Sequence, residues 1–499
     1  MKIYTEEMKA KLPVIKKTRE LRKKRSVSSP VYQEQGRHAG ISCAGVPAIN
    51  CMLEKLNFSE TINAKLHLFK IQQPYTEACH VLNIGMNALF GARTLDDIGI
   101  RRTDEAILKS LGKNSLPAPT TAGDFCRRFS ESSIADLMDA INEVRKKVWK
   151  TQNSDFFEIA RIDADGVLVE TGAECAEGVD YSYKKVWGYH PLVVSLAETQ
   201  EPLFIVNRSG SRPSHEGAAH WLDRAAELCQ SAGFKKVRFR GDTDFSQTRF
   251  LDSWTDRGIE FVFGMDAMPN LKQIADDLQD SNWSRLLRDV RAVDEDEERE
   301  PQIRHKRKVI EQRKFRHLEL AEEYIAETAY SPVACSRKYR LIILKKIISV
   351  HQGKEMLFPQ TRYFFYISNI QNCSAREIVR EANDRCNQEN LNSHLKAGVN
   401  ALRAPLKTLD SNWAYMVMTA LSWSFKAWFA MIMPVKRETK SQDLAMRIRL
   451  LTMEFRTFLN CLIMIPCLVI CTARRIQLRL LTTTRWTGLL LKFAKALRE

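Results

Sequence analysis

Three charged residues at helical spacing are the first candidates for chemistry in this sequence. Arg385, Glu389 and Lys396 stand four and then seven positions apart, within a stretch (residues 375–396) whose apolar and small residues recur at helical intervals. On one helix of 3.6 residues per turn, these three side chains fall within about one stripe. A carboxylate between two cations is an ordinary ion-pair ladder on a solvated face, or part of an acidic site if other acids lie beside it.

Two pairs of aspartates far upstream supply such acids. Asp163 and Asp165 lie in the segment IDADG, and Asp242 and Asp244 lie in FRGDTDF, each at a predicted strand. Carboxylates that converge on one spot repel one another and have raised pKa values unless divalent cations neutralise them. Because hard oxygen ligands favour Mg²⁺, or Mn²⁺ in its place, the sequence predicts a site for one of these ions.

Simpler explanations compete for these aspartates. Asp165 and the glycine after it form a D-G pair that is typical of a tight turn, and Asp242 and Asp244 could merely end a strand. A calcium-binding EF-hand loop starting at Asp163 is excluded, because its sixth position must be glycine and is Leu168. The sequence contains no Walker glycine loop, HExxH helix or nucleophile elbow.

The elements that must position the acids follow from the hydrophobic pattern after residue 155. Strand patterns occupy residues 156–170, 187–196, 201–209, 235–245 and 257–265, and an amphipathic helix pattern occupies residues 214–233. Because side chains alternate along a strand, Asp163 and Asp165 project from the same face. Three strands, a helix and a fourth strand beside the first predict a ribonuclease-H-like α/β core, a mixed sheet flanked by helices with acids on neighbouring strands.

The composition restricts the class of protein and its partner. The chain has 499 residues, 44% of them hydrophobic, which is enough for more than one packed domain. Its net charge of +16 and pI near 9.3 favour a polyanionic partner, either nucleic acid or an anionic membrane. Twelve cysteines without a C-x-x-C pair indicate reduced thiols in a cytosolic protein, and the N-terminus lacks the apolar core of a signal peptide.

Two late apolar runs are predicted to be core elements and not membrane spans. Residues 413–425 are too few for a span, and residues 459–471 are interrupted by Pro466. We therefore expect no membrane partner.

The pattern along the chain predicts six regions. Residues 1–40 form a basic arm, 41–150 a helical domain, 151–264 the first part of the ribonuclease-H-like core, 265–370 an inserted, partly β subdomain, 371–435 the last part of the core with the Glu389 helix, and 436–499 a basic region of open role. Within the helical domain, a helix, a turn and a second helix place Arg127 and Arg128 at the surface. This arrangement fits a DNA-docking module, although plain helical domains show the same pattern.

Taken in this order, the motifs resemble those of the DDE transposases of bacterial insertion sequences, in the branch marked by an Arg-x3-Glu-x6-Lys helix. The resemblance covers roughly residues 40–480. It implies Asp165 as the first acid, with Asp163 as the alternative, and favours Asp242 over Asp244 as the second. Two departures stand out, because Val167 replaces a threonine and Ala382 stands where the family often has a tyrosine.

The resemblance also implies a function. It predicts a transposase that binds the terminal inverted repeats of an insertion sequence and catalyses metal-dependent cleavage and strand transfer of double-stranded DNA, as a homo-oligomer at the nucleoid in the bacterial cytoplasm. Asp165, Asp242 and Glu389 would be the catalytic ligands of two Mg²⁺ or Mn²⁺ ions. Arg385 and Lys396 would bind DNA phosphates. The alternatives are a related DNA nuclease or recombinase, and a non-catalytic DNA-binding protein.

Overall fold

The computed structural model of the chain describes residues 39–70, 74–286, 318–351, 354–436, 439–472, 475–484 and 486–498. Residues 1–38 of the predicted basic arm lie outside the described residues. Residues 40–499 form one compact unit. The finer division into domains stays a prediction.

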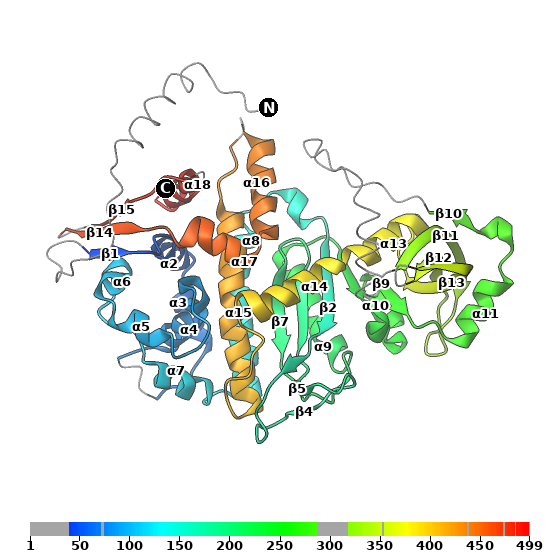
Figure 1. Cartoon of the computed structure of the whole chain (residues 1–499), viewed down its shortest axis with the longest axis horizontal. Helices are drawn as coiled ribbons and strands as arrows, with labels where there is room; N and C mark the ends of the chain where they lie inside the picture. Colours follow the sequence, from blue (N-terminus) through cyan, green and yellow to red (C-terminus); the bar gives the residue numbers. More distant parts are fainter. Residues whose placement is uncertain are drawn as a thin grey trace, which may run out of the picture. The chain divides into compact units, whose positions relative to one another are not determined.

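A mixed sheet stands at the centre of this unit (Figure 1). Its strands are β2 (Ala160–Gly166), β6 (Leu192–Leu196), β7 (Glu201–Val206), β8 (Val237–Gly241), β9 (Glu260–Met265), β10 (Ser284–Arg285), β11 (Leu318–Tyr330), β12 (Tyr339–His351) and β13 (Lys354–Ser368). They lie side by side in the order β10-β11-β12-β13-β9-β8-β2-β6-β7.

Three parallel strands in the middle of the sheet carry the acids. β2 pairs with β8, and β8 pairs with β9, both in parallel, with Arg240 of β8 opposite Asp163 of β2 and Val262 of β9. β6 and β7 continue the sheet beyond β2 in antiparallel pairing. Helix α9 (Ala218–Ala232) ends at Gly233, whose left-handed φ of 104° suits glycine, and leads from β7 back to β8. The predicted order of three strands, a helix and a fourth strand beside the first is confirmed, and so is the mixed α/β fold.

The long strands of the predicted insertion continue the same sheet. β13 pairs antiparallel with β9, placing Phe365 opposite Met265 and Ser368 opposite Val262. β11 and β12 then add to β13. These strands lie in the region predicted to be a partly β insertion, and they extend the core sheet.

Helices precede, cover and follow the sheet. They are α2 (Gly45–Lys55), α3 (Phe58–Lys65), α4 (Glu77–Gly85), α5 (Ile98–Thr103), α6 (Glu105–Ser110), α7 (Pro119–Cys126), α8 (Glu131–Trp149), α10 (Leu251–Asp256), α11 (Pro269–Asp277), α13 (Ala375–Asp384), α14 (Cys386–Ser393), α15 (Leu409–Ile432), α16 (Lys440–Thr452), α17 (Phe455–Phe458) and α18 (Thr487–Ala496). The predicted N-terminal helical domain corresponds to α2 through α8.

Short strands complete the chain. They are β1 (Ala39–Ile41), β3 (Val169–Glu170), β4 (Asp180–Tyr181), β5 (Trp187–Tyr189), β14 (Cys467–Cys471) and β15 (Ile476–Leu480). β3, β5 and β4 form a small sheet, and β14 pairs antiparallel with β15.

The aromatic helix α15 packs on the edge strand β7. Its indole N–H groups bond to that strand and the residue before it: Trp413 donates to the carbonyl of Ile205, and Trp423 donates to the carbonyl of Gln200 at 2.6 Å. Nearly every residue of α15 is buried, which accounts for its apolar sequence. In the described part of the chain, no helix combines the length and apolar character that a membrane crossing needs.

Candidate active site

The two candidate aspartates lie at the same edge of the sheet. Asp165 is near the end of β2, and Asp242 directly follows β8. Because these strands are parallel neighbours, their carboxyl ends open toward the same side, which is where ligands bind in many α/β sheets. The structure therefore brings together the first two predicted acids.

The Asp165 carboxylate is surrounded by charges of both signs. Burial raises its pKa to about 6; the guanidinium of Arg385 opposes this shift, and the carboxylates of Asp242 and Glu389 add to it. Asn392 on α14 donates from Nδ2 to Asp165 Oδ2 at 2.8 Å. Three predicted site residues thus act electrostatically on Asp165.

Asp242 has a similar environment. Its side chain caps a short 3-10 turn, accepting from the backbone N–H of Asp244 at 3.1 Å. Burial raises its pKa, Arg385 opposes the shift, and the carboxylates of Asp244 and Asp266 add to it. Nη2 of Arg385 lies 3.8 Å from Asp242 Oδ2. Arg385 therefore links the helix to the strand-end acids.

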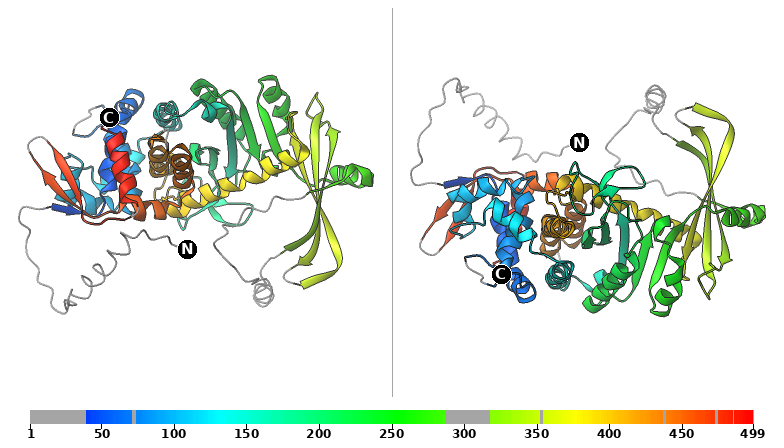
Figure 2. Two further views of the ribbon diagram at one scale, coloured as in Figure 1. Left: turned by 90° about the horizontal axis from the view of Figure 1, so that it is seen from above. Right: turned by 90° about the horizontal axis from the view of Figure 1, so that it is seen from below.

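The stretch predicted to form one helix is divided. Helix α13 ends at Asp384, Arg385 stands between the two helices, and α14 continues into a π-helical segment, η6 (His394–Gly398). The predicted single helix is wrong in this respect. Figure 2 shows α13 and α14 following one another along the sheet, from the β11–β13 side toward α15.

Glu389 and Lys396 sit on the outer part of this helical run. Both side chains are exposed. Glu389 still influences the pKa of Asp165, whereas Lys396 lies in η6. In the described ranges, no three acidic, histidine or cysteine side chains approach closely enough to hold a metal ion together. The Glu389 carboxylate would therefore have to turn inward to join the two aspartates.

The chemistry of the donor set nevertheless fits a hard divalent cation. The candidate ligands are carboxylate oxygens, and the raised pKa values of Asp165 and Asp242 reflect buried negative charge that a cation would stabilise. The amide oxygen of Asn392 is also buried without a hydrogen-bond partner in the structure. A third oxygen donor, neutral and already positioned by its bond to Asp165, therefore stands beside the aspartates.

Asp163 has a different role from its neighbour. Its two carboxylate oxygens accept from Nε and Nη2 of Arg240, at 2.6 and 2.7 Å, and both side chains are only 2% exposed. Since its oxygens are occupied by a guanidinium, the geometry favours Asp165 as the first candidate ligand.

The arginines predicted to dock on DNA lie on another element. Arg127 and Arg128 directly follow α7, and both are exposed. Arg127 pairs with Asp124 at 2.6 Å. It also lines a groove of about 760 Å³ together with Arg93 and Arg403. The structure does not bring Arg127 and Arg128 into the acidic cluster, so their contact with DNA stays a prediction.

Sequence reasoning missed several residues of this site. Asp266 follows β9, the third parallel strand, and could have been found by the rule that selected Asp242, an acid at a strand end. Asn392 stands three positions after Glu389, so helical spacing could have placed it near the same face. Lys184, whose pKa is raised by Tyr183 and to a smaller extent by Asp165 and Asp244, carries no sequence signal.

Comparisons with known proteins match the chain to a family and to solved structures. The family described as "Transposase DDE domain group 1" matches residues 31–499. A solved structure of the piggyBac transposase synaptic complex with hairpin DNA is similar at a TM-score of 0.34 and 11% identity, covering 85% of this chain and 83% of that chain. A search of curated proteins found no match.

Proposed function

The chain belongs to the transposase DDE domain group 1 family, and from this premise we propose that it binds the terminal inverted repeats of a bacterial insertion sequence and catalyses metal-dependent DNA cleavage and strand transfer. The observation that carries the proposal is the pair Asp165 and Asp242, on adjacent parallel strand ends, with Arg385 and Glu389 within electrostatic reach. Proteins of this family generally use divalent metal ions. The acidic site supports the same requirement here.

In this proposal, Asp165, Asp242 and Glu389 hold two Mg²⁺ or Mn²⁺ ions. Such ions supply a nucleophilic oxygen at neutral pH and stabilise the oxygen that leaves phosphorus. The chain's own contribution is to hold the carboxylates at the strand ends. Asn392 orients Asp165 through the 2.8 Å bond to Oδ2.

The positively charged side chains near the site would bind the DNA. Arg385, whose Nη2 lies 3.8 Å from Asp242 Oδ2, would bind a phosphate of the DNA beside the acids. Lys396 is exposed and would bind a phosphate as a point charge. Arg127 and Arg128 would contact the DNA backbone farther from the chemistry. Pairing of two element ends would require a homo-oligomer.

The first test is cleavage of a duplex that carries the flanking inverted repeat. Wild type and Glu389→Gln are compared with Mg²⁺, Mn²⁺ or Ca²⁺, and binding is measured on the same duplex. We expect Glu389→Gln to lower the cleavage rate by about 100-fold or more while binding is retained, because the variant loses a metal-ligating charge but keeps its size.

A matched control is Asp384→Asn, which removes an exposed acid five positions earlier on the same helical run. It should cleave as wild type does. Unchanged cleavage in Glu389→Gln would remove Glu389 from the site. Cleavage without a strand-transfer product would favour a nuclease, and binding without cleavage in wild type would favour a non-catalytic DNA-binding protein.

A further inference from the structure

One carboxylate on α13 joins three arginines of the sheet. Glu381 accepts from Arg161 Nε at 2.6 Å and from Arg238 Nη1 at 2.8 Å. It also accepts from Arg240 Nη1 at 3.2 Å. Arg161 belongs to β2, and Arg238 and Arg240 belong to β8. Glu381 therefore ties the helix to the two strands that end in Asp165 and Asp242.

Arg240 also contacts the backbone of α13, just before that helix ends. Nη1 of Arg240 donates to the main-chain carbonyl of Glu381 at 3.3 Å. In a continuous α-helix that carbonyl is the acceptor for the N–H of Arg385. At the end of α13, the capping backbone hydrogen bond is accepted by the carbonyl of Asn383. A side chain that inserts into the helical hydrogen-bond ladder is a known cause of kinks.

Beyond the break, α14 is anchored separately. Gln388 donates from Nε2 to the carbonyl of Val193 on β6 at 3.0 Å, and Asn392 donates to Asp165. The direction of α14 sets both contacts and the position of Glu389. The position of α14 beyond Arg385 therefore decides which side chains the helix presents to the strand ends.

We propose that Glu381 is a positioning residue of the site: by binding Arg161, Arg238 and Arg240 it places the break at Arg385 and aims α14, with Glu389, at Asp165 and Asp242. This inference rests on the proposed function. It extends that function to a residue that lies outside the acidic cluster.

The network around Glu381 is balanced in charge and is buried at its centre. Its described members are Arg161, Lys236, Arg238 and Arg240 on the cationic side and Asp163, Glu198, Glu260 and Glu381 on the acidic side. The side chains of Arg240, Arg238 and Glu381 are 2%, 9% and 14% exposed. Loss of the Glu381 carboxylate therefore removes one of the two acidic partners of each of these arginines, and with it the side-chain bonds that tie α13 to β8.

The test compares Glu381→Gln with Glu198→Gln in the full chain. Glu198 shares Arg161 as its partner, at 2.9 Å, but is not part of the helix. Both variants remove one carboxylate from the network. Mn²⁺ binding is measured by calorimetry, DNA binding and cleavage are measured on the inverted-repeat duplex, and the fraction folded is matched by circular dichroism.

If Glu381 positions the helix, Glu381→Gln binds Mn²⁺ about tenfold more weakly and cleaves about 10- to 100-fold more slowly at unchanged KM for DNA, whereas Glu198→Gln resembles wild type. Glu381→Asp, which keeps the charge, should recover part of the loss. Equal effects of the two Gln variants would assign Glu381 a merely structural role and overturn the inference.

The two proposals fail in different ways. A wild-type chain that neither binds Mn²⁺ nor cleaves the duplex refutes the proposed function and the inference with it. A wild-type chain that does both, beside an unaffected Glu381→Gln variant, refutes the inference alone. If Glu381→Gln does not fold, Glu381→Asp supplies the comparison with Glu198→Gln.

Discussion

The charged form of Asp165 is electrostatically unfavourable in the folded chain, which is not expected of a residue with a purely structural role. Its carboxyl group is partly buried beside two other carboxylates, and its pKa is raised from 3.8 to about 6. A raised pKa means that the folded chain disfavours the charged form, which is the form that binds a cation. Such a cost is typical of functional sites, where stability is lowered by the groups that carry out the chemistry.

Neutralising this residue should stabilise the metal-free chain. We expect Asp165→Asn to increase the free energy of unfolding by about 1–3 kcal/mol at pH 7, because a pKa shift of one unit corresponds to about 1.4 kcal/mol. The asparagine can still accept the bond from Asn392. Thermal denaturation with and without Mn²⁺ measures the effect, and Mn²⁺ should stabilise wild type only.

The sign of the pH dependence follows from the same shift. The folded chain holds the proton of Asp165 up to about pH 6, whereas the unfolded chain releases it near pH 3.8. The contribution of Asp165 to stability is therefore present below pH 3.8 and is lost as the pH rises through 6. Asp165→Asn should abolish this loss. An equal pH dependence in both proteins would contradict the assignment.

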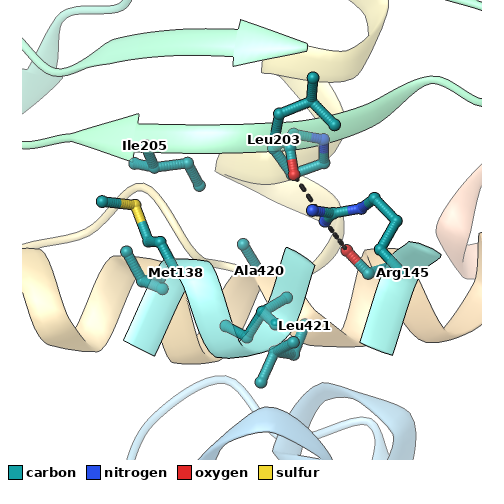
Figure 3. Close-up of a pocket in the computed structure, with 10 residues that line it drawn as sticks. Met138, Arg145, Leu203, Ile205, Ala420 and Leu421 are labelled. Carbon is teal, nitrogen blue, oxygen red and sulfur yellow. Dashed lines mark hydrogen bonds between the residues drawn. The ribbon is translucent and has the colours of Figure 1, made fainter. Parts of the chain in front are cut away.

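At the scale of elements, a buried ion pair joins α8, β7 and α15. Arg145 Nε lies 3.0 Å from Glu201 Oε1, and their side chains are 1% and 0% exposed. Trp428 of α15 donates to the same carboxylate oxygen at 2.7 Å. Figure 3 shows Arg145 and Leu203 among the residues that line a small cavity, whose volume is about 20 Å³. This pair holds the helical region against the edge of the core sheet.

Removing the charge of only one partner of this ion pair should destabilise the chain more than removing the charges of both partners. We expect Arg145→Met to cost about 3–5 kcal/mol, because it leaves the Glu201 carboxylate buried without its cation. Adding Glu201→Gln should recover most of the loss, since glutamine is neutral and still accepts from Trp428. Chemical denaturation of the two single variants and the double variant measures the coupling. Additive effects would show that the pair is not coupled.

At the scale of the whole molecule, positive charge is concentrated toward both ends of the sequence. Residues 436–499 contain thirteen lysines and arginines against four acids, a net +9 out of +16 for the chain. Arg127 and Arg128 add exposed charge in the helical region. A polyanion the size of duplex DNA could contact both regions, and its affinity would then fall steeply with salt.

The contribution of the helical region can be separated by its salt dependence. We expect Arg127→Gln with Arg128→Gln to weaken binding to the inverted-repeat duplex and to reduce the slope of log K against log salt by about 2, one for each phosphate contact. The double lysine variant should keep the slope. Lys109→Gln on α6, an exposed lysine paired with Glu105, is the matched control. An unchanged slope would exclude these arginines from the interface.

The sequence by itself predicted the core strands, the place of β8 beside β2, and acids at the ends of these two strands. Alternation identifies strands because side chains point to opposite faces, and the helix between β7 and β8 dictates a parallel neighbour for β2. These are local patterns and short connections, which a sequence displays directly.

Only the tertiary structure shows that Asp163 is paired with an arginine and that the helix is interrupted at Arg385. Asp163 and Asp165 share a strand face in the sequence pattern, but the register of β2 against β8 places Arg240 beside Asp163 and neutralises it. The break at Arg385 coincides with contacts from Arg240 on a distant strand to the backbone and side chain of Glu381. Helical periodicity cannot reveal either feature, because both depend on side chains that lie far apart in the chain and meet only when the sheet is assembled.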